Sequence, residues 1–126
     1  MTAKELRIGN YLYLCGWYTK VVGVREDGVY VVNDLNTIFK SDITDVRPIP
    51  LTKRFFEKNG FIGCDEYGTH MRSADLHMEV FKTSGGWSVH IDDDHCITVF
   101  SKCIKYIHEL QNAYYISTGK ELEIKL

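Results

Sequence analysis

The first fifty residues alternate between apolar and polar positions, and frequent turn signals interrupt the alternation. Ile8, Leu12 and Leu14 set the pattern before a turn at 15–18, and Val22 and Val24 resume it afterwards. Alternation with a period of two is typical of strands that have one buried face. Two further turns, at 26–28 and 33–36, separate strands at 29–32, 37–39 and 43–49. Short strands this closely spaced predict a five-stranded SH3-like barrel over residues 1–51.

The turn at 26–28 contains Asp27-Gly28, a strong hairpin signal. We expect a type I′ turn there, because Gly tolerates the positive φ that this turn needs.

A short helix is predicted to follow the barrel. Pro48 and Pro50 end the sheet, since proline donates no ladder hydrogen bond, and Thr52 is suited to cap a helix over 53–59. Gly60 is suited to the position just after its last turn. Residues 62–75 show no clear period and are expected to be a loop or an irregular edge.

Three strands, at 76–81, 87–91 and 97–99, form the next predicted element, an antiparallel meander. Residues directly opposite each other share a face, so the parity of the apolar positions fixes the number of residues in each turn. A two-residue turn at Ser84-Gly85 would place Glu79 opposite His90. A three-residue turn over 93–95 would place Asp92 beside Cys96 and would turn Ile97 and Val99 inward.

The clearest helical pattern runs from Ser101 to Gly119. Cys103, Ile107 and Leu110 lie on its apolar stripe, and His108 and Gln111 would face solvent. Residues 122–126 alternate and predict a final edge strand. The fold class is therefore α+β, with residues 52–126 forming one compact unit together with the barrel.

Composition adds few constraints beyond size and charge. The 126 residues are 44% hydrophobic and carry a net charge of −2, which argues against nucleic-acid or membrane binding by bulk charge. The four cysteines have no C-x-x-C spacing, and the polar start of the chain shows no signal region or apolar span. We therefore expect a cytoplasmic protein with free thiols and no cofactor.

The outward face of the meander is the sharpest chemical candidate. His77, Glu79, His90, Asp92 and Cys96 would gather there, and these are ligand types for zinc and groups for acid–base catalysis. A metal-dependent hydrolase built on His77, His90 and Asp92 is one hypothesis. A solvated face with cross-strand charge pairs is the simpler interpretation, because metal sites usually show tighter spacing; a face covered by the last helix is the third. The run 92–94 lacks the spacing of a calcium loop and is interpreted as an acidic turn.

Aromatic residues mark a second candidate surface, on the barrel. Trp17, Tyr18 and Tyr30, flanked by Lys20 and Arg25, would form a contact surface for a protein partner. Alternatively, Trp17 closes one end of the barrel. Our first hypothesis is a non-enzymatic protein-interaction module. The alternative is a nucleic-acid-binding accessory protein, which would need Lys20, Arg25, Lys53 and Arg54 on one face.

Three stretches, 5–10, 49–52 and 107–122, carry a resemblance. With their sequences ELRIGN, IPLT and IHELQN through TGKEL, the chain resembles a family of small uncharacterised proteins encoded in Bacteroidetes genomes and in their phages and prophages. The resemblance implies a bacterial or phage cytoplasmic setting and assigns no catalytic or binding residue.

Overall fold

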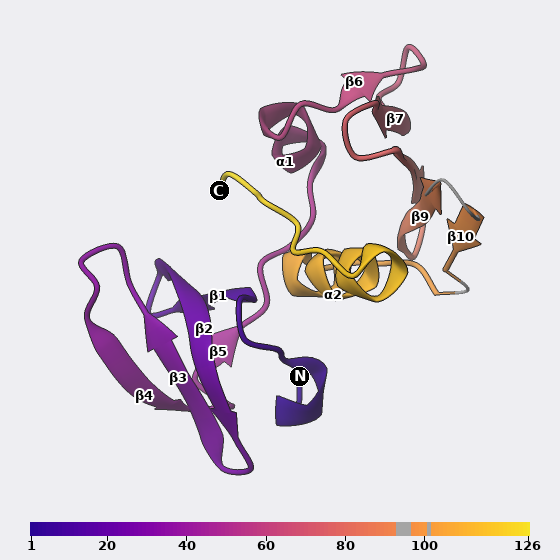
Figure 1. Ribbon diagram of the computed structural model, residues 1–126. Helices are drawn as coiled ribbons and strands as arrows, with labels where there is room; N and C mark the ends of the chain where they lie inside the picture. Colours follow the sequence, from indigo (N-terminus) through magenta and orange to yellow (C-terminus); the bar gives the residue numbers. More distant parts are fainter. Residues whose placement is uncertain (93–96, 101) are drawn as a thin grey trace. The chain divides into compact units, whose positions relative to one another are not determined.

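The computed structural model describes residues 1–92, 97–100 and 102–126 (Figure 1). The fold is α+β, as predicted, and the chain forms two compact units. Unit 1 consists of Met1–Pro50 and Tyr106–Asn112, and unit 2 of Leu51–Lys105 and Ala113–Leu126. Helix α2 (Ile107–Thr118) therefore contributes its first half to unit 1 and its second half to unit 2.

Sheet A of unit 1 is a five-stranded antiparallel half-barrel, and a 3-10 turn, η1 (Ala3–Glu5), precedes it. Its order is β4-β3-β2-β1-β5, so β4 and β5 form its two edges. The strands are β1 (Tyr11–Leu14), β2 (Trp17–Arg25), β3 (Gly28–Val32), β4 (Ile38–Asp42) and β5 (Val46–Arg47).

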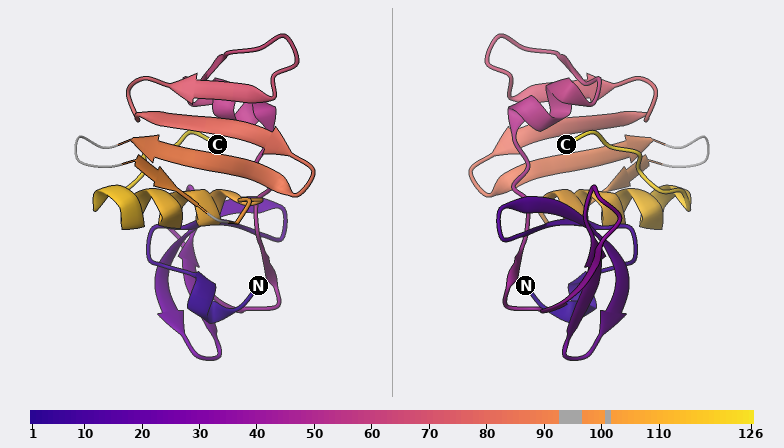
Figure 2. Two further views of the ribbon diagram at one scale, coloured as in Figure 1. Left: turned by 90° about the vertical axis from the view of Figure 1, so that its right-hand side faces the viewer. Right: turned by 90° about the vertical axis from the view of Figure 1, so that its left-hand side faces the viewer.

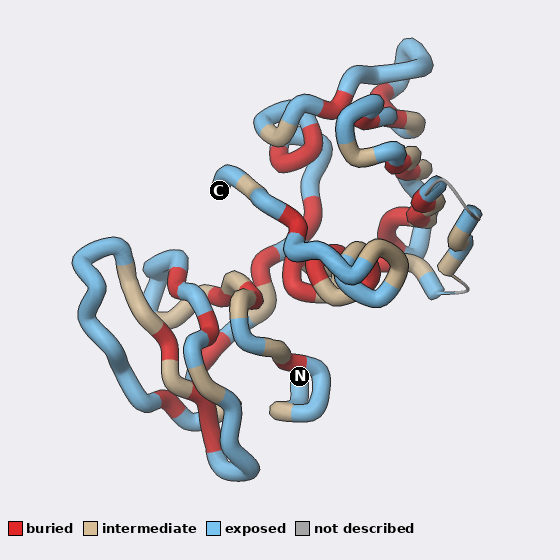
Figure 3. The backbone as a smooth tube through the Cα atoms, in the orientation of Figure 1, coloured by how far each residue is buried: buried red, intermediate tan, exposed pale blue. Residues whose placement is uncertain are grey.

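The inner face of sheet A holds the core of unit 1. Leu12 pairs with Thr19 and Val21 pairs with Val31, and all four side chains are buried. Figure 3 shows such buried positions in red along the strands, between more exposed ones. Alternation along β1 and β3 thus removes every second side chain from water. The predicted pattern was wrong at Ile8, Val22 and Val24, which are exposed; a bulge between Val21 and Gly23 shifts the register of β2. The hydrophobic cluster comprises Leu6, Leu12, Val21, Val29, Val31 and Val46.

The β2–β3 turn differs from the predicted type. Arg25 pairs with Gly28 around the two residues Glu26 and Asp27, and neither these residues nor Gly28 has a positive φ. The type I′ prediction was therefore wrong. Glycine is needed at 28 for another reason, because a Cβ there would lie 2.3 Å from the backbone oxygen of Ser41 on β4.

The first half of α2 completes unit 1 through side-chain hydrogen bonds. Gln111 accepts a hydrogen bond from the Tyr11 amide at 2.9 Å and donates one to the Gly9 carbonyl at 3.0 Å. Its neighbour Asn112 accepts from Asn10 at 2.8 Å and donates to the Glu5 carbonyl at 2.9 Å. The prediction that Gln111 and His108 face solvent was wrong, because both are 1% exposed.

Sheet C of unit 2 is also five-stranded and antiparallel, in the order β10-β9-β8-β7-β6. Two of its strands, one of them the edge strand β6, lie in the stretch 62–75 that was predicted to be a loop or an irregular edge. The strands are β6 (Ile62–Gly63), β7 (His70–Ser73), β8 (Met78–Thr83), β9 (Gly86–Asp92) and β10 (Ile97–Val99).

The parity of the apolar positions predicted the β8–β9 pairing of sheet C correctly and the β9–β10 pairing wrongly. Thr83 pairs with Gly86 around the two-residue Ser84-Gly85 turn, so Glu79 lies opposite His90 as expected. The next pairing differs from the predicted one, because Ile97 and not Cys96 lies opposite Asp92. Ile97 and Val99 are consequently on the outer face, 67% and 57% exposed, where the sequence had placed them inside.

The inner face of sheet C packs on α1 (Lys53–Lys58), as Figure 2 shows. Thr52 caps α1 by accepting a hydrogen bond from the Phe55 amide at 3.1 Å, and Gly60 follows at φ +84°, both as predicted. The Phe56 ring meets Trp87 edge to face, with the centroids 4.7 Å apart. Aromatic pairs of this kind stabilise a core beyond the area they bury.

The end of the chain departs from the prediction in two places. Helix α2 begins at Ile107, so Cys103 and Ile104 precede it, and Ile104 forms an isolated bridge with Trp87 instead. Its predicted cap, Ser101, lies outside the described residues. Residues 122–126 form no strand; Asn59 instead hydrogen-bonds both backbone groups of Lys125, at 2.6 and 2.9 Å. Neither described helix is both long and apolar enough to cross a membrane.

Candidate functional site

An apolar groove lies at one end of the inner face of sheet A. Leu14 pairs with Trp17, so both side chains share the face of the buried Leu12 and Thr19. Trp17 is 69% exposed and Leu35 is 83% exposed. The groove has a volume of about 340 Å³, and its lining consists of Leu14, Cys15, Trp17, Tyr18, Thr19, Asn33, Asp34, Leu35 and Phe39.

Two turns position this groove. Cys15 and Gly16 form the β1–β2 turn with φ values of 52° and 83°. Positive φ at both central residues is the requirement of a type I′ turn, so the chain places that turn here and begins β2 at Trp17. On the other wall, the Asn33 side chain accepts hydrogen bonds from the amides of Leu35 and Thr37, each at 3.0 Å. These bonds hold Leu35 at the rim.

A wider cleft of about 860 Å³ separates the two edges of sheet A. One wall is the β4 segment 39–42, and the other comes from β1, its turn and β5, including Tyr13, Leu14 and Arg47. Since β4 and β5 end the strand order, the half-barrel is open along this cleft. Ile38 and Phe39 on the β4 edge are 63% and 43% exposed.

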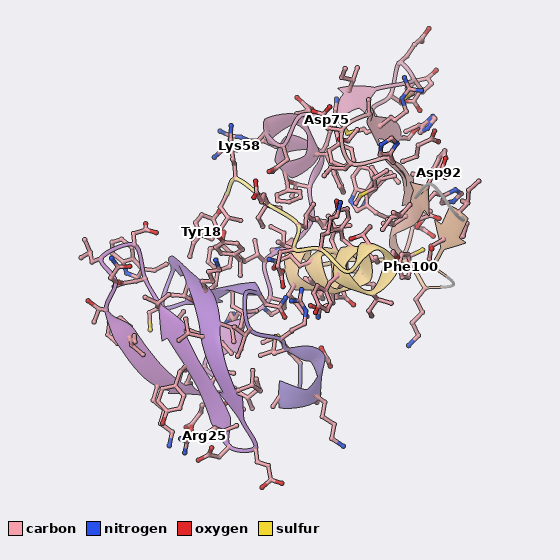
Figure 4. All side chains as sticks on the ribbon, in the orientation of Figure 1. Tyr18, Arg25, Lys58, Asp75, Asp92 and Phe100 are labelled. Atoms are coloured by element: carbon pink, nitrogen blue, oxygen red, sulfur yellow. The ribbon has the colours of Figure 1, made fainter. Side chains whose placement is uncertain are left out.

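The outer face of sheet A carries the other predicted aromatic residues. The Tyr13 and Tyr18 rings stack with centroids 4.8 Å apart, and their hydroxyls lie 3.0 Å apart. This hydrogen bond, together with burial, raises the pKa of Tyr13 above its ordinary value. Tyr18 and Arg25 lie at opposite ends of the sheet (Figure 4). The five predicted contact residues are thus divided: Trp17 lies on the inner face, and Tyr18, Lys20, Arg25 and Tyr30 on the outer face.

The basic residues of the chain are also divided. Lys53 and Arg54 belong to unit 2, so they are no part of sheet A. The register instead adds two cations that sequence reasoning did not single out. Lys40 lies opposite Tyr30, and Arg47 lies opposite Tyr13. Strand pairing between β1 and the late strand β5 brings Arg47 there, and no local signal in the sequence encodes that pairing.

On sheet C, the outer face adds Phe81 and His70 to the residues predicted around His90. The Phe81 ring lies between two imidazoles, 4.2 Å from His70 and 5.0 Å from His90. His70 Nε2 lies 3.2 Å from Glu79 Oε2. His70 was missed because its strand was predicted to be a loop or an irregular edge; the alternation over 70–73 is the only signal that could have found it.

Three of the predicted metal ligands, His77, His90 and Asp92, line one hollow together with Glu79, as the strand parity predicted. His77 lies in the turn before β8 at φ 51°, and its carbonyl accepts a hydrogen bond from the Asp92 amide at 2.8 Å. Cys96 and the acidic residues Asp93 and Asp94 lie outside the described residues. Within residues 1–92, 97–100 and 102–126, no group of three or more His, Cys, Asp or Glu side chains could hold a metal ion. The hollow that His77, Glu79, His90 and Asp92 line has a volume of about 500 Å³, and Arg72 and Ile97 also border it.

Comparison of the chain with protein-family models, with curated proteins and with solved structures finds no match. The geometry of the residues is therefore the basis for the functional conclusion.

Proposed function

We propose that this protein is a non-enzymatic protein-interaction module that binds an extended segment of a partner protein along the open side of sheet A. The observation that carries the proposal is Trp17, 69% exposed at the rim of an apolar groove. A large aromatic ring held in water beside a preformed apolar hollow is the arrangement of a binding hot spot.

The edge strand β4 supplies the second part of the argument. An edge strand presents unpaired backbone N–H and C=O groups, and natural proteins usually protect such edges with charges, bulges or a covering element. Here β4 exposes Ile38 and also Phe39, which lines the cleft between the sheet edges. An extended peptide that added to β4 would gain main-chain hydrogen bonds, and alternate side chains would enter the groove beneath Trp17.

The strand order supports a finer proposal about the fold. A meander from β4 to β1 in which β5 returns beside β1 is consistent with an SH3-like barrel. In this proposal the partner segment fills the gap that keeps the barrel open. The cellular setting we propose is the bacterial or phage cytoplasm, on the sequence resemblance described above.

A peptide selection tests this function. Extended peptides with alternating apolar residues should be selected from a random library by the intact protein and bind it in solution. Trp17→Ala should weaken the selected peptides about 30-fold, because loss of a hot-spot aromatic costs about 2 kcal/mol or more. The matched control is Tyr67→Ala, which removes an aromatic ring that is 81% exposed in unit 2.

Hydrogen exchange distinguishes strand addition from other binding modes. Bound peptide should slow exchange of backbone amides along β4 and leave those of β6, an edge strand of sheet C, unchanged. Equal binding to Trp17→Ala and the parent protein, or protection confined to sheet C, would contradict the proposed function.

A further inference from the structure

The outer face of sheet A combines tyrosine rings with positive charge along its whole length. The rings are those of Tyr11, Tyr13, Tyr18 and Tyr30, and the register places Lys20, Lys40 and Arg47 directly opposite members of this set. Lys20 pairs with Tyr11, Lys40 with Tyr30, and Arg47 with Tyr13. This face is distinct from the inner-face groove around Trp17, although Tyr18 borders both.

The cations and rings are in contact, so they form a preorganised surface. Lys20 Nζ lies over the Tyr11 ring, 5.7 Å from its centroid, and the Arg25 guanidinium lies 5.3 Å from the centroid of Tyr30. Tyr30 in turn rests against Gly23, where a Cβ would lie 3.5 Å from the ring. The stacked pair formed by Tyr13 and Tyr18 is fixed further by the contact between its hydroxyls.

Charge on this face is positive although the whole chain carries −2. The acidic residues near it are Glu26, Asp27 and Asp42, which lie at the β2–β3 turn end of the sheet, and Asp45, which lines the same cleft as Arg47. Asp27 pairs with Lys40 at 3.5 Å. No carboxylate among the described residues forms an ion pair with Lys20, Arg25 or Arg47.

We propose that the outer face of sheet A binds single-stranded nucleic acid. Exposed bases would stack on the tyrosine rings, and Lys20, Arg25 and Arg47 would contact phosphates, the combination that sequence-independent single-strand binders use. From Tyr18 to Arg25 the face extends roughly 23 Å along β2, enough for several nucleotides. An acidic peptide would satisfy the cations but not the ring faces, and a duplex keeps its bases stacked inside.

Fluorescence anisotropy with a short labelled oligouridylate tests this proposal on the full chain. Three phosphate contacts give a salt slope of roughly −2, so affinity should fall about 20-fold between 50 and 200 mM salt. Replacing Lys20 and Arg25 together by Ala should weaken binding and reduce the slope by roughly 1.4. The charge-matched control replaces Lys53 and Arg54, on α1 of unit 2, by Ala and should leave both quantities unchanged.

A pair of tyrosine variants separates base stacking from simple charge attraction. Tyr11→Leu with Tyr30→Leu should weaken binding about tenfold, whereas Phe at both positions keeps the ring faces and should bind like the parent. Thermal unfolding of each variant checks that sheet A remains folded. Absence of binding at 50 mM salt, equal affinity for a duplex, full competition by polyglutamate, or unchanged binding by the Leu variant would each overturn the proposal. Since Tyr11 and Tyr30 line neither the groove nor the cleft, these variants leave the peptide-binding test independent.

Discussion

Two polar residues on the first half of α2 are buried to the same extent and have opposite hydrogen-bonding states. Gln111 uses both ends of its amide on the backbone at the start of β1. His108 lies three residues earlier and is also 1% exposed, yet neither ring nitrogen has a hydrogen-bond partner. Glu5 Oε2 lies 3.9 Å from His108 Nε2. Burial of an unpaired imidazole disfavours its charged form.

This burial makes the stability of the fold depend on pH. Removal from water lowers the pKa of His108 below its ordinary value, and the charges of Glu109 and Glu5 oppose this only in part. In the unfolded chain His108 has a pKa near 6.5. As the pH falls below that value, the unfolded state takes up a proton that the folded state does not. We therefore expect stability to decrease below about pH 6.5, by at most about 1.4 kcal/mol per pH unit, until the folded-state pKa is reached.

Urea unfolding at about pH 7.5 and about pH 5.5 measures the effect. His108→Leu should flatten the pH dependence, because it removes the titrating group. His77→Asn provides the control: His77 is exposed and has a positive φ that Asn tolerates well. If the His108 variant kept the parent's pH dependence, another group would be responsible.

At the scale of elements, sequence reasoning succeeded where the signal was local. The cap of α1 at Thr52, the glycine after it and the Ser84-Gly85 turn each depend on a few neighbouring residues. The β9–β10 register was predicted wrongly because Ile97 and Val99 were assumed to be buried, and both are exposed. Hydrophobicity reports where a side chain is stable, not whether the fold supplies a partner surface for it.

Gly28 shows how an element depends on a contact that the sequence does not reveal. It pairs with Asp42 on β4, and a Cβ would collide with the Ser41 carbonyl. We expect Gly28→Ala to lower the free energy of unfolding by about 1–3 kcal/mol, the range for overpacking a tightly packed site. Chemical denaturation measures this loss, and hydrogen exchange should show it first at β4.

Gly63→Ala is the matched control for Gly28. Gly63 lies in the two-residue edge strand β6, and a Cβ there would come no closer than 3.9 Å to a neighbouring atom. Alanine at 63 should be neutral or slightly stabilising, because it restricts the unfolded chain. Equal losses at 28 and 63 would show that the close approach of Ser41 is not responsible.

At the scale of the whole molecule, the sequence indicated the fold class and much of the element order but not the composition of the units. Unit 1 takes seven residues, Tyr106–Asn112, from the far end of the chain. Contacts this distant in sequence leave no periodic trace. The same limit applies to the candidate sites: Trp17 and the tyrosines could be identified as aromatic contacts, but their division between two faces follows from strand register.

The last prediction concerns residues 1–51, the segment that the sequence indicated as a barrel. Without α2, the Tyr11 amide and the Gly9 carbonyl lose their hydrogen bonds to the Gln111 side chain. The Asn10 side chain and the Glu5 carbonyl lose their hydrogen bonds to the Asn112 side chain. Each lost hydrogen bond costs about 1 kcal/mol, and a segment this small has little stability to lose. Fragment 1–51 should therefore be unfolded by circular dichroism and show poor amide dispersion in NMR.

The same fragment joined to residues 104–118 by a flexible Gly/Ser linker should fold, and the linked Gln111→Leu variant should be less stable by about 2–4 kcal/mol. A dispersed spectrum and cooperative unfolding of fragment 1–51 alone would show that the inner-face core of sheet A is sufficient.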